Sequence, residues 1–197
     1  MSGVRIPWLG YALMVLGVVL LIIPFLPLLN RVRVYEQRQS TGWWRDKLGS
    51  ARIIWASYLI GGSTQNAELL KSGNFKRLIL LSPDNQAVKA IKEMESDKSV
   101  EELQKNIRDL TGFAQKRNCD VRWCHDITYS LITIGNPPEL GGTPPKDMWV
   151  FVEVYVPGIE AEKRPSFFLE WSKNQKLADK MLISFNKLWD HSRPASK

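Results

Sequence analysis

The hydrophobic pattern of the chain begins with an unbroken apolar run. Residues 8–29 read WLGYALMVLGVVLLIIPFLPLL and contain no charged side chain. A helix rises about 1.5 Å per residue, so the run matches the roughly 30 Å hydrocarbon core of a bilayer. It is longer than the apolar region of a secretory signal, and its end lacks a small-residue cleavage site. The pattern therefore predicts a transmembrane helix over residues 8–29.

Beyond the run, apolar positions alternate between strand-like and helix-like spacing. In MWVFVEVYVPG, Met148 and every second residue after it are apolar, which is the period of a strand. After Ser99, which forms a capping box with Glu102, apolar residues recur at steps of three and four. We predict strands over residues 51–60, 76–83, 119–126, 129–135, 148–158 and 165–171. We predict helices over residues 66–73, from Asp84 or Asn85 onward, over 99–114 and over 176–189.

This order of elements predicts an α/β fold class. We expect one N-terminal transmembrane helix followed by a single mixed-sheet α/β sandwich domain, in which helices cover the sheet. The expected divisions are an N-terminal segment (1–30), a basic juxtamembrane linker (31–49), a ligand-binding domain (50–191) and a disordered basic tail (192–197). A domain of this size has room for a proper core.

Charge sets the expected orientation and partners. The formal net charge is +7, and basic residues cluster directly after residue 30. An excess of Lys and Arg marks the cytoplasmic flank of a span, so we predict a single-pass cell-membrane protein with its N-terminus outside and its domain in the cytoplasm. The basic flank would attract anionic inner-leaflet lipids of the bilayer. The remaining positive charge is scattered along the sequence, so we expect no double-stranded nucleic acid as a partner.

The apolar run also carries features of helix association. Gly3, Gly10 and Gly17 recur every seven residues and would share one face of the helix. Small residues allow close helix packing in lipid, which favours a homo-oligomer, although glycine is also common in membrane helices without such a role. Trp8 and Tyr11 suit the outer interfacial belt.

Two loops are candidates for binding a phosphate-bearing ligand. The first follows the strand predicted over 51–60 and comprises Gly61, Gly62, Ser63, Thr64, Gln65 and Asn66. Glycine permits close approach of a ligand, and helix N-termini favour anions. A tight turn with a Ser/Thr cap explains the same residues without a ligand and is the favoured reading. The second candidate, weaker still, comprises Ser82, Asp84 and Asn85.

Metal and catalytic signals are weak. Cys119 and Cys124 would point to opposite faces of a strand, and His125 completes no tetrahedral set, so we predict no metal and no cofactor. Glu153 and Glu170 could pair across neighbouring strands, but solvent-side positions on an amphipathic sheet are favoured. We assign no catalytic residue and predict that the chain is not an enzyme.

The soluble part resembles a degenerate, single-repeat phospholipase D-like domain. The resemblance lies in ARIIWASYLIGG, KRLILLSPDNQAVKAI, NCDVRWCHD, YSLITIGNP, WVFVEVYVP and FNKLWDHS, in that order. Active members carry His-x-Lys where this chain has Ser130-Leu131-Ile132, so the resemblance implies binding without phosphodiester cleavage. A span before an α/β domain is also similar to type III CRISPR membrane effectors, whose CARF domains bind cyclic oligoadenylate.

These observations lead to one predicted function and two alternatives. We expect a non-enzymatic, membrane-anchored effector that senses a nucleotide or cyclic oligonucleotide and passes the signal to oligomeric membrane helices, plausibly in antiviral defence. One alternative is a membrane-tethered phosphodiesterase or phospholipase-like enzyme with an altered active site. The other is a structural anchor that recruits a protein partner.

Overall fold

The chain folds around one mixed β-sheet. The structure, a computed structural model, describes residues 32–35, 41–58, 68, 70–84, 86, 88–89, 92, 99–125, 130–139, 142–154 and 163–195. The strands are β1 Val32–Tyr35, β2 Ile54–Tyr58, β3 Phe75–Leu81, β4 Asp120–Cys124, β5 Ser130–Gly135, β6 Trp149–Val154, β7 Ser166–Glu170 and β8 Arg193–Pro194. The helices with defined bounds are α3 Thr41–Gly49, α6 Val100–Gln115 and α7 Trp171–His191.

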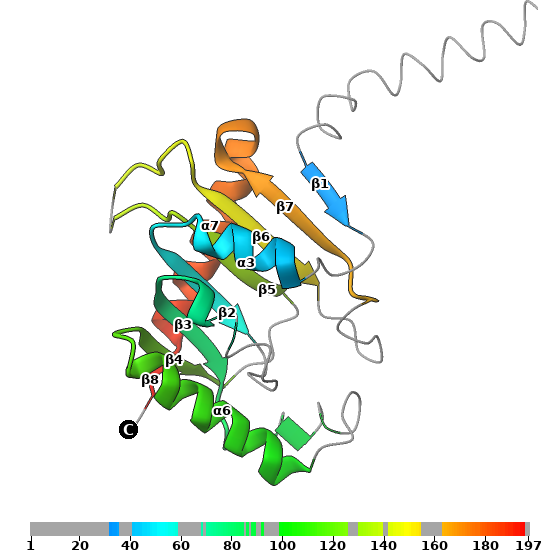
Figure 1. Cartoon of the computed structure of the whole chain (residues 1–197), viewed down its shortest axis with the longest axis vertical. Coiled ribbons are helices and arrows are strands. Elements are labelled where there is room, and N and C mark those ends of the chain that lie inside the picture. The colour runs from blue at the N-terminus through cyan, green and yellow to red at the C-terminus, as the bar shows by residue number, and fades with distance from the viewer. Residues whose placement is uncertain are drawn as a thin grey trace, which may run out of the picture.

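The eight strands lie in the order β1-β7-β6-β5-β2-β3-β4-β8 (Figure 1). β2, β3 and β4 are parallel, whereas the other neighbouring pairs are antiparallel. The register places Ala56, Leu78 and Val121 side by side across the parallel strands. Such buried parallel strands read as near-continuous apolar runs, as the sequence of β3 does.

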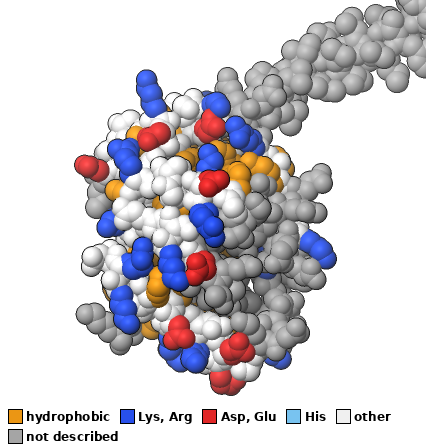
Figure 2. Space-filling view, viewed as in Figure 1, with side chains coloured by type: hydrophobic (Ala, Val, Ile, Leu, Met, Phe, Trp, Pro, Cys, Tyr) orange, Lys and Arg blue, Asp and Glu red, His pale blue; other side chains and the backbone are white. Residues whose placement is uncertain are grey.

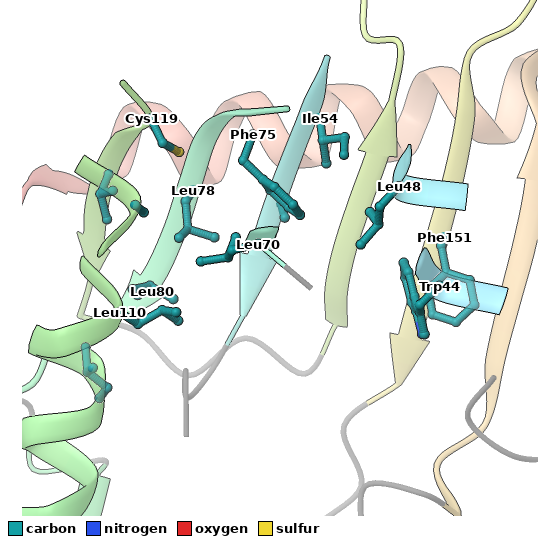
Figure 3. Packing of buried hydrophobic residues seen from close by; sticks show 14 of the residues in the cluster. Trp44, Leu48, Ile54, Leu70, Phe75, Leu78, Leu80, Leu110, Cys119 and Phe151 are labelled. Atoms are coloured by element: carbon teal, nitrogen blue, oxygen red, sulfur yellow. The ribbon is translucent and has the colours of Figure 1, made fainter. Parts of the chain in front are cut away.

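Helices cover both faces of the sheet. α3 and α6 lie on one face and α7 lies on the other (Figures 1 and 3). Under α3 and α6, Trp44, Leu48, Leu78, Ile107 and Phe151 belong to one core cluster. Under α7, a second cluster contains residues of the opposite strand face and of the helix: Trp55, Ile79, Ile134, Val150, Phe185 and Trp189. The predicted mixed-sheet α/β domain is therefore present.

The clearest predicted helix is confirmed in detail. α6 begins after Ser99, whose hydroxyl accepts a hydrogen bond from the Glu102 amide at 3.1 Å, as the capping box predicts. Its buried residues include Leu103, Ile107 and Leu110, at the expected helical steps. α7 also exists, and its range begins at Trp171. Asn174 has the non-helical angles φ −135° and ψ 41°, so the regular helix beyond this kink begins within one residue of the predicted residue 176.

The inward face of α7 differs slightly from the prediction. We expected Leu177, Met181, Phe185 and Leu188 to face inward. Of these, only Phe185 is fully buried, and its buried companions are instead Ala178, Leu182 and Trp189, with the other three predicted residues partly buried. The buried face is thus shifted by about one residue, and within it Trp189 stacks on Phe185 at a centroid distance of 6.3 Å.

Two segments predicted to lie outside the domain instead take part in it. Within the predicted linker 31–49, β1 pairs with β7, and α3 buries Trp44 and Leu48 against the sheet. Within the predicted tail 192–197, β8 pairs with β4. Both segments are short and carry several polar residues, so their periodicity is too weak to show a strand or helix.

The predicted fold class is corrected in its membrane part. Within the described ranges, no helix combines the length and the apolar character that a membrane crossing requires. The predicted span, residues 8–29, lies outside the described residues, as do Trp8, Gly10, Tyr11 and Gly17. The predicted single-pass localisation, with the N-terminus outside and the domain in the cytoplasm, therefore has no described helix to support it.

Candidate nucleic-acid interface

The outer surface of α7 carries a row of lysines. Lys176, Lys180 and Lys187 are all exposed. Their steps of four and seven residues keep them within about 40° of one another around a helix that turns 100° per residue. They span eleven residues, or roughly 16 Å along the axis at 1.5 Å per residue. We call these three residues the lysine face.

The lysine face is not neutralised by neighbouring acids. Among the described residues, none of its three members lies within 4.0 Å of a carboxylate oxygen. Asp179, which lies on the same helix, instead accepts a hydrogen bond at 2.7 Å from the indole Nε1 of Trp171. Asp190 is exposed near the C-terminal end of the helix. The face is therefore a site of net positive charge.

The N-terminal end of α7 is anchored by an ion-pair cluster. Glu170, at the end of β7, pairs with Lys173 and with Arg33 of β1, the latter at 3.5 Å. The hydrogen bond and charge of Lys173, with the charge of Arg33, hold the pKa of Glu170 below its usual value. Lys173 is thus engaged by a carboxylate, and we do not count it in the lysine face.

The C-terminal half of α7 is held on the sheet by stacked aromatic rings and arginines. Phe185 stacks between Trp55 of β2, at 5.7 Å, and Trp189, at 6.3 Å. Arg77 lies over both indoles, and the Arg122 guanidinium lies 4.4 Å from the Trp189 ring centroid. Arg122 also donates through Nη1 to the Trp189 carbonyl at 2.9 Å, at the negative end of the helix. The lysine face therefore rests on a rigid base.

The other face of the domain has a different charge pattern. On the face that α3 and α6 cover, basic and acidic side chains alternate over the surface (Figure 2). On α6, for example, Arg108 forms an ion pair with Asp84 at 2.7 Å, and acidic Glu101 and Glu102 occupy the first turn. A mixed surface of this kind creates little net field, in contrast to the lysine face.

The residues predicted to bind a ligand are only partly placed by the structure. Gly61 to Asn66 and Asn85 lie outside the described residues. Ser82 is buried directly after β3, and its amide donates to the Cys124 carbonyl at 2.8 Å. Asp84 is exposed and paired with Arg108. These contacts are those of an ordinary strand end, and the assignment of Ser82 and Asp84 to a ligand stays a prediction.

The structure also places the residues of the possible metal site and of the possible carboxylate pair. Cys119 and Cys124 belong to the clusters on opposite sheet faces, as predicted. Within the described ranges, no group of three His, Cys, Asp or Glu side chains could hold a metal ion. Glu153 and Glu170 do not pair, because the register sets Glu153 opposite Ser166 and Glu170 opposite Trp149. The solvent-side placement of Glu153 is wrong, since it is 5% exposed and paired with the buried Arg164.

The sequence reading missed the lysine face although its signal was present. Lysine recurs at residues 173, 176, 180 and 187 with helical spacing. Along the sequence the positive charge is scattered, whereas around α7 these lysines are aligned. The alignment of these lysines therefore removes the reason for excluding double-stranded nucleic acid as a partner.

Comparisons with known proteins give little further guidance. No protein-family model matches the chain. No curated protein matches it. A similar solved structure is that of TrmBL2, an archaeal chromatin protein whose structure shows a novel mode of DNA binding. The similarity covers 96% of this chain and 67% of that chain, at 13% identity and a TM-score of 0.46. A likeness this low carries no argument about what this chain binds.

These findings correct several predictions. The resemblances to phospholipase D-like and CARF domains are corrected, because no model of either family matches the chain. The predicted function, an antiviral membrane effector that senses a nucleotide, is corrected too. No family model supports the domain it assumed, and no helix of the described residues could cross a membrane. The partners predicted for that effector are corrected with it, because they depended on the membrane helix and on the sensing domain. They are the lipid bilayer, anionic lipids, cyclic oligoadenylate and an oligomer of membrane helices. The exclusion of double-stranded nucleic acid is corrected as well.

Proposed function

We propose that this domain binds double-stranded DNA through the lysine face of α7, by contacts to the phosphate backbone. The observation that carries the proposal is the alignment of Lys176, Lys180 and Lys187 on one exposed helix surface without acidic partners among the described residues. Duplex DNA presents one phosphate per 3.4 Å of axis on each strand, so a row of about 16 Å faces several phosphates at once.

The type of side chain favours backbone contacts over base recognition. Lysine ammonium groups act as point charges towards phosphate, and phosphate contacts position a protein without reading sequence. The arginines near the same helix are not available for base edges, because Arg77 and Arg122 are stacked on indole rings. We therefore expect weak dependence on DNA sequence and strong dependence on salt. The prediction that the chain is not an enzyme remains part of this proposal, since binding of this kind needs no catalytic group.

Binding to a fluorescein-labelled 20-base-pair duplex, followed by anisotropy at several salt concentrations, tests the proposal. Each phosphate contact contributes about 0.9 to the slope of log K against log salt, so three contacts predict a slope contribution near −3. The variant K176Q/K180Q/K187Q should weaken binding at low salt at least tenfold and reduce the slope by about that amount.

A matched variant separates the lysine face from overall charge. K105Q/K116Q/K146Q also removes three exposed lysines, two of them on or next to α6 on the other face and one before β6. This control should bind as the unaltered chain does. Equal loss in both triple variants would show that only net charge matters and would overturn the assignment to α7. Absence of binding by the unaltered chain at low salt would overturn the proposed function.

A further inference from the structure

A hollow lies on the face opposite α7, between the end of α3 and the end of α6. Its volume is about 490 Å³, within the range of about 300–1,000 Å³ that is usual for small-molecule sites. Part of its wall comes from the residues directly before β3, namely Ser72, Gly73 and Asn74. It is separated from the lysine face by the whole thickness of the sheet, so its occupant need not be related to DNA.

The floor of the hollow is apolar. It is formed by Leu48, Leu70, Phe75, Ala114 and Cys119, each of which is at most 5% exposed. Figure 3 shows Leu48, Leu70, Phe75 and Cys119 in front of the strands, on elements that are distant in sequence. Burial raises the pKa of the Cys119 thiol to about 12, so this sulfur is a neutral part of the floor at physiological pH. The floor suits a small aliphatic or aromatic group, and the walls around it are mostly polar.

The rim of the hollow carries two basic side chains, Lys71 and Arg117, which differ in their ion pairing. Lys71 is tied to Glu68 at 2.6 Å, so its charge is largely neutralised. Arg117 is exposed, and among the described residues no carboxylate lies within 4.0 Å of its guanidinium. Its guanidinium carbon lies 5.8 Å from the Phe113 ring centroid. The nearest acidic residue in sequence, Asp120, lies in β4 next to Val121, which faces the α6 side, so alternation directs the carboxylate to the other face.

We propose that this hollow binds a small amphipathic anion, with an apolar body on the floor and one carboxylate or sulfonate group at Arg117. A guanidinium that no described carboxylate pairs with, beside an apolar floor, is complementary to that one class of ligand, because the planar fork of arginine matches such oxyanions in two hydrogen bonds. The body gains from removal of apolar surface from water, and the anionic group fixes its orientation.

Two fluorescent probes that differ only in charge test this proposal. 1-Anilinonaphthalene-8-sulfonate has an aromatic body with a sulfonate, whereas N-phenyl-1-naphthylamine has the same body without it. The full chain should bind the sulfonate with a dissociation constant at least tenfold lower than that of the neutral probe. R117Q should remove that preference, while K116Q, which removes a neighbouring charge that does not line the hollow, should preserve it.

A second pair of variants tests the location. Gly49 lines the hollow, and a Cβ built on it meets only the Ser72 carbonyl oxygen, at 3.7 Å. G49L should therefore fold and occupy the hollow, so that both probes lose affinity at least tenfold. Gly112 of α6 has nothing within 4 Å of a Cβ and does not line the hollow, so G112L should bind both probes normally. Retained binding in G49L, or retained preference for the sulfonate in R117Q, would overturn the proposal. Probe binding by K176Q/K180Q/K187Q should equal that of the unaltered chain, so failure here is distinct from failure of DNA binding.

Discussion

The Arg77 guanidinium lies 4.2 Å from the ring centroid of Trp55, its direct partner on the neighbouring strand, and 5.0 Å from that of Trp189. Arg77 belongs to β3, Trp55 to β2 and Trp189 to α7, so one charged side chain joins two strands to the helix. Partial burial lowers the pKa of Arg77, but arginine remains charged at any ordinary pH. The positive charge of Arg77 therefore interacts with both indole rings at any ordinary pH.

Replacing Arg77 should loosen α7 from the sheet. R77Q removes the cation from two rings and shortens the apolar stem that covers them, which should cost about 1–2 kcal/mol of unfolding free energy. Urea denaturation followed by tryptophan fluorescence measures this cost. K76Q alters the adjacent exposed residue and should change stability by less than about 0.5 kcal/mol. Equal stability of both variants would show that the stacking adds nothing.

The elements that could be predicted are those whose periodicity is long and regular. β6 and α6 were predicted because each presents at least five apolar residues at a fixed step. β1 and β8 are only four and two residues long, and they exist through pairing with β7 and β4. Such pairing depends on distant parts of the chain, which no local pattern shows. α3 was not predicted, because its sequence TGWWRDKLG has few apolar residues at helical steps, although the helix buries Trp44 and Leu48.

The candidate sites show the same limit. The lysine row of α7 is visible in the sequence, but its importance depends on which face of the helix is exposed. Glu153 was expected at the surface because sheets with one exposed face alternate in polarity. Here both faces are covered by helices, so the alternation of β6 places Glu153 in the interior. The hollow near Arg117 is built from several separate segments, and its signal exists only after folding.

The buried pair of Glu153 and Arg164 should be costly to break on one side only. Arg164 Nη1 lies 3.4 Å from Glu153 Oε1, and the two side chains are 8% and 7% exposed, respectively. R164M leaves a buried carboxylate without this partner, so it should lose about 3–5 kcal/mol, whereas E153L/R164M should recover much of that loss. Chemical denaturation of the four chains of this double-mutant cycle measures the coupling.

The exposed pair of Arg108 and Asp84 provides the control for that cycle. Its side chains are 53% and 69% exposed, and R108M should cost about 0–1 kcal/mol because water replaces the partner. If R164M cost as little unfolding free energy as R108M, Glu153 would not be left as a buried, unpaired carboxylate when Arg164 is replaced.

Asn136 and Asn118 share a backbone conformation but differ in what their side chains do. Their φ angles are 51° and 58°, in the region that favours glycine. The Asn136 side chain accepts from the Arg52 amide at 2.8 Å and donates to Asp147 Oδ2 at 2.9 Å, whereas Asn118 is exposed. N136G should lose about 1–3 kcal/mol, or roughly 2–10 °C in melting temperature, and N118G should be neutral or slightly stabilising. Calorimetry measures the melting temperatures of both variants. Equal values would contradict the stabilising role of the Asn136 side chain.

The Cys119 thiol should make stability fall at high pH. Burial raises its pKa in the folded chain from 9.0 to about 12. Below pH 9 the thiol is protonated in both states, so its contribution is complete. Between pH 9 and 12 the unfolded chain loses this proton while the folded chain keeps it, which favours unfolding by up to about 1.4 kcal/mol per pH unit. The difference in unfolding free energy between the unaltered chain and C119A should therefore shrink as the pH rises from 8 to 10.5. Urea denaturation of both chains with reductant present measures that difference, in which the lysines and tyrosines common to both cancel. A constant difference across this range would mean that the thiol ionises as readily in the folded chain as in the unfolded one, and the floor of the hollow would then be open to water.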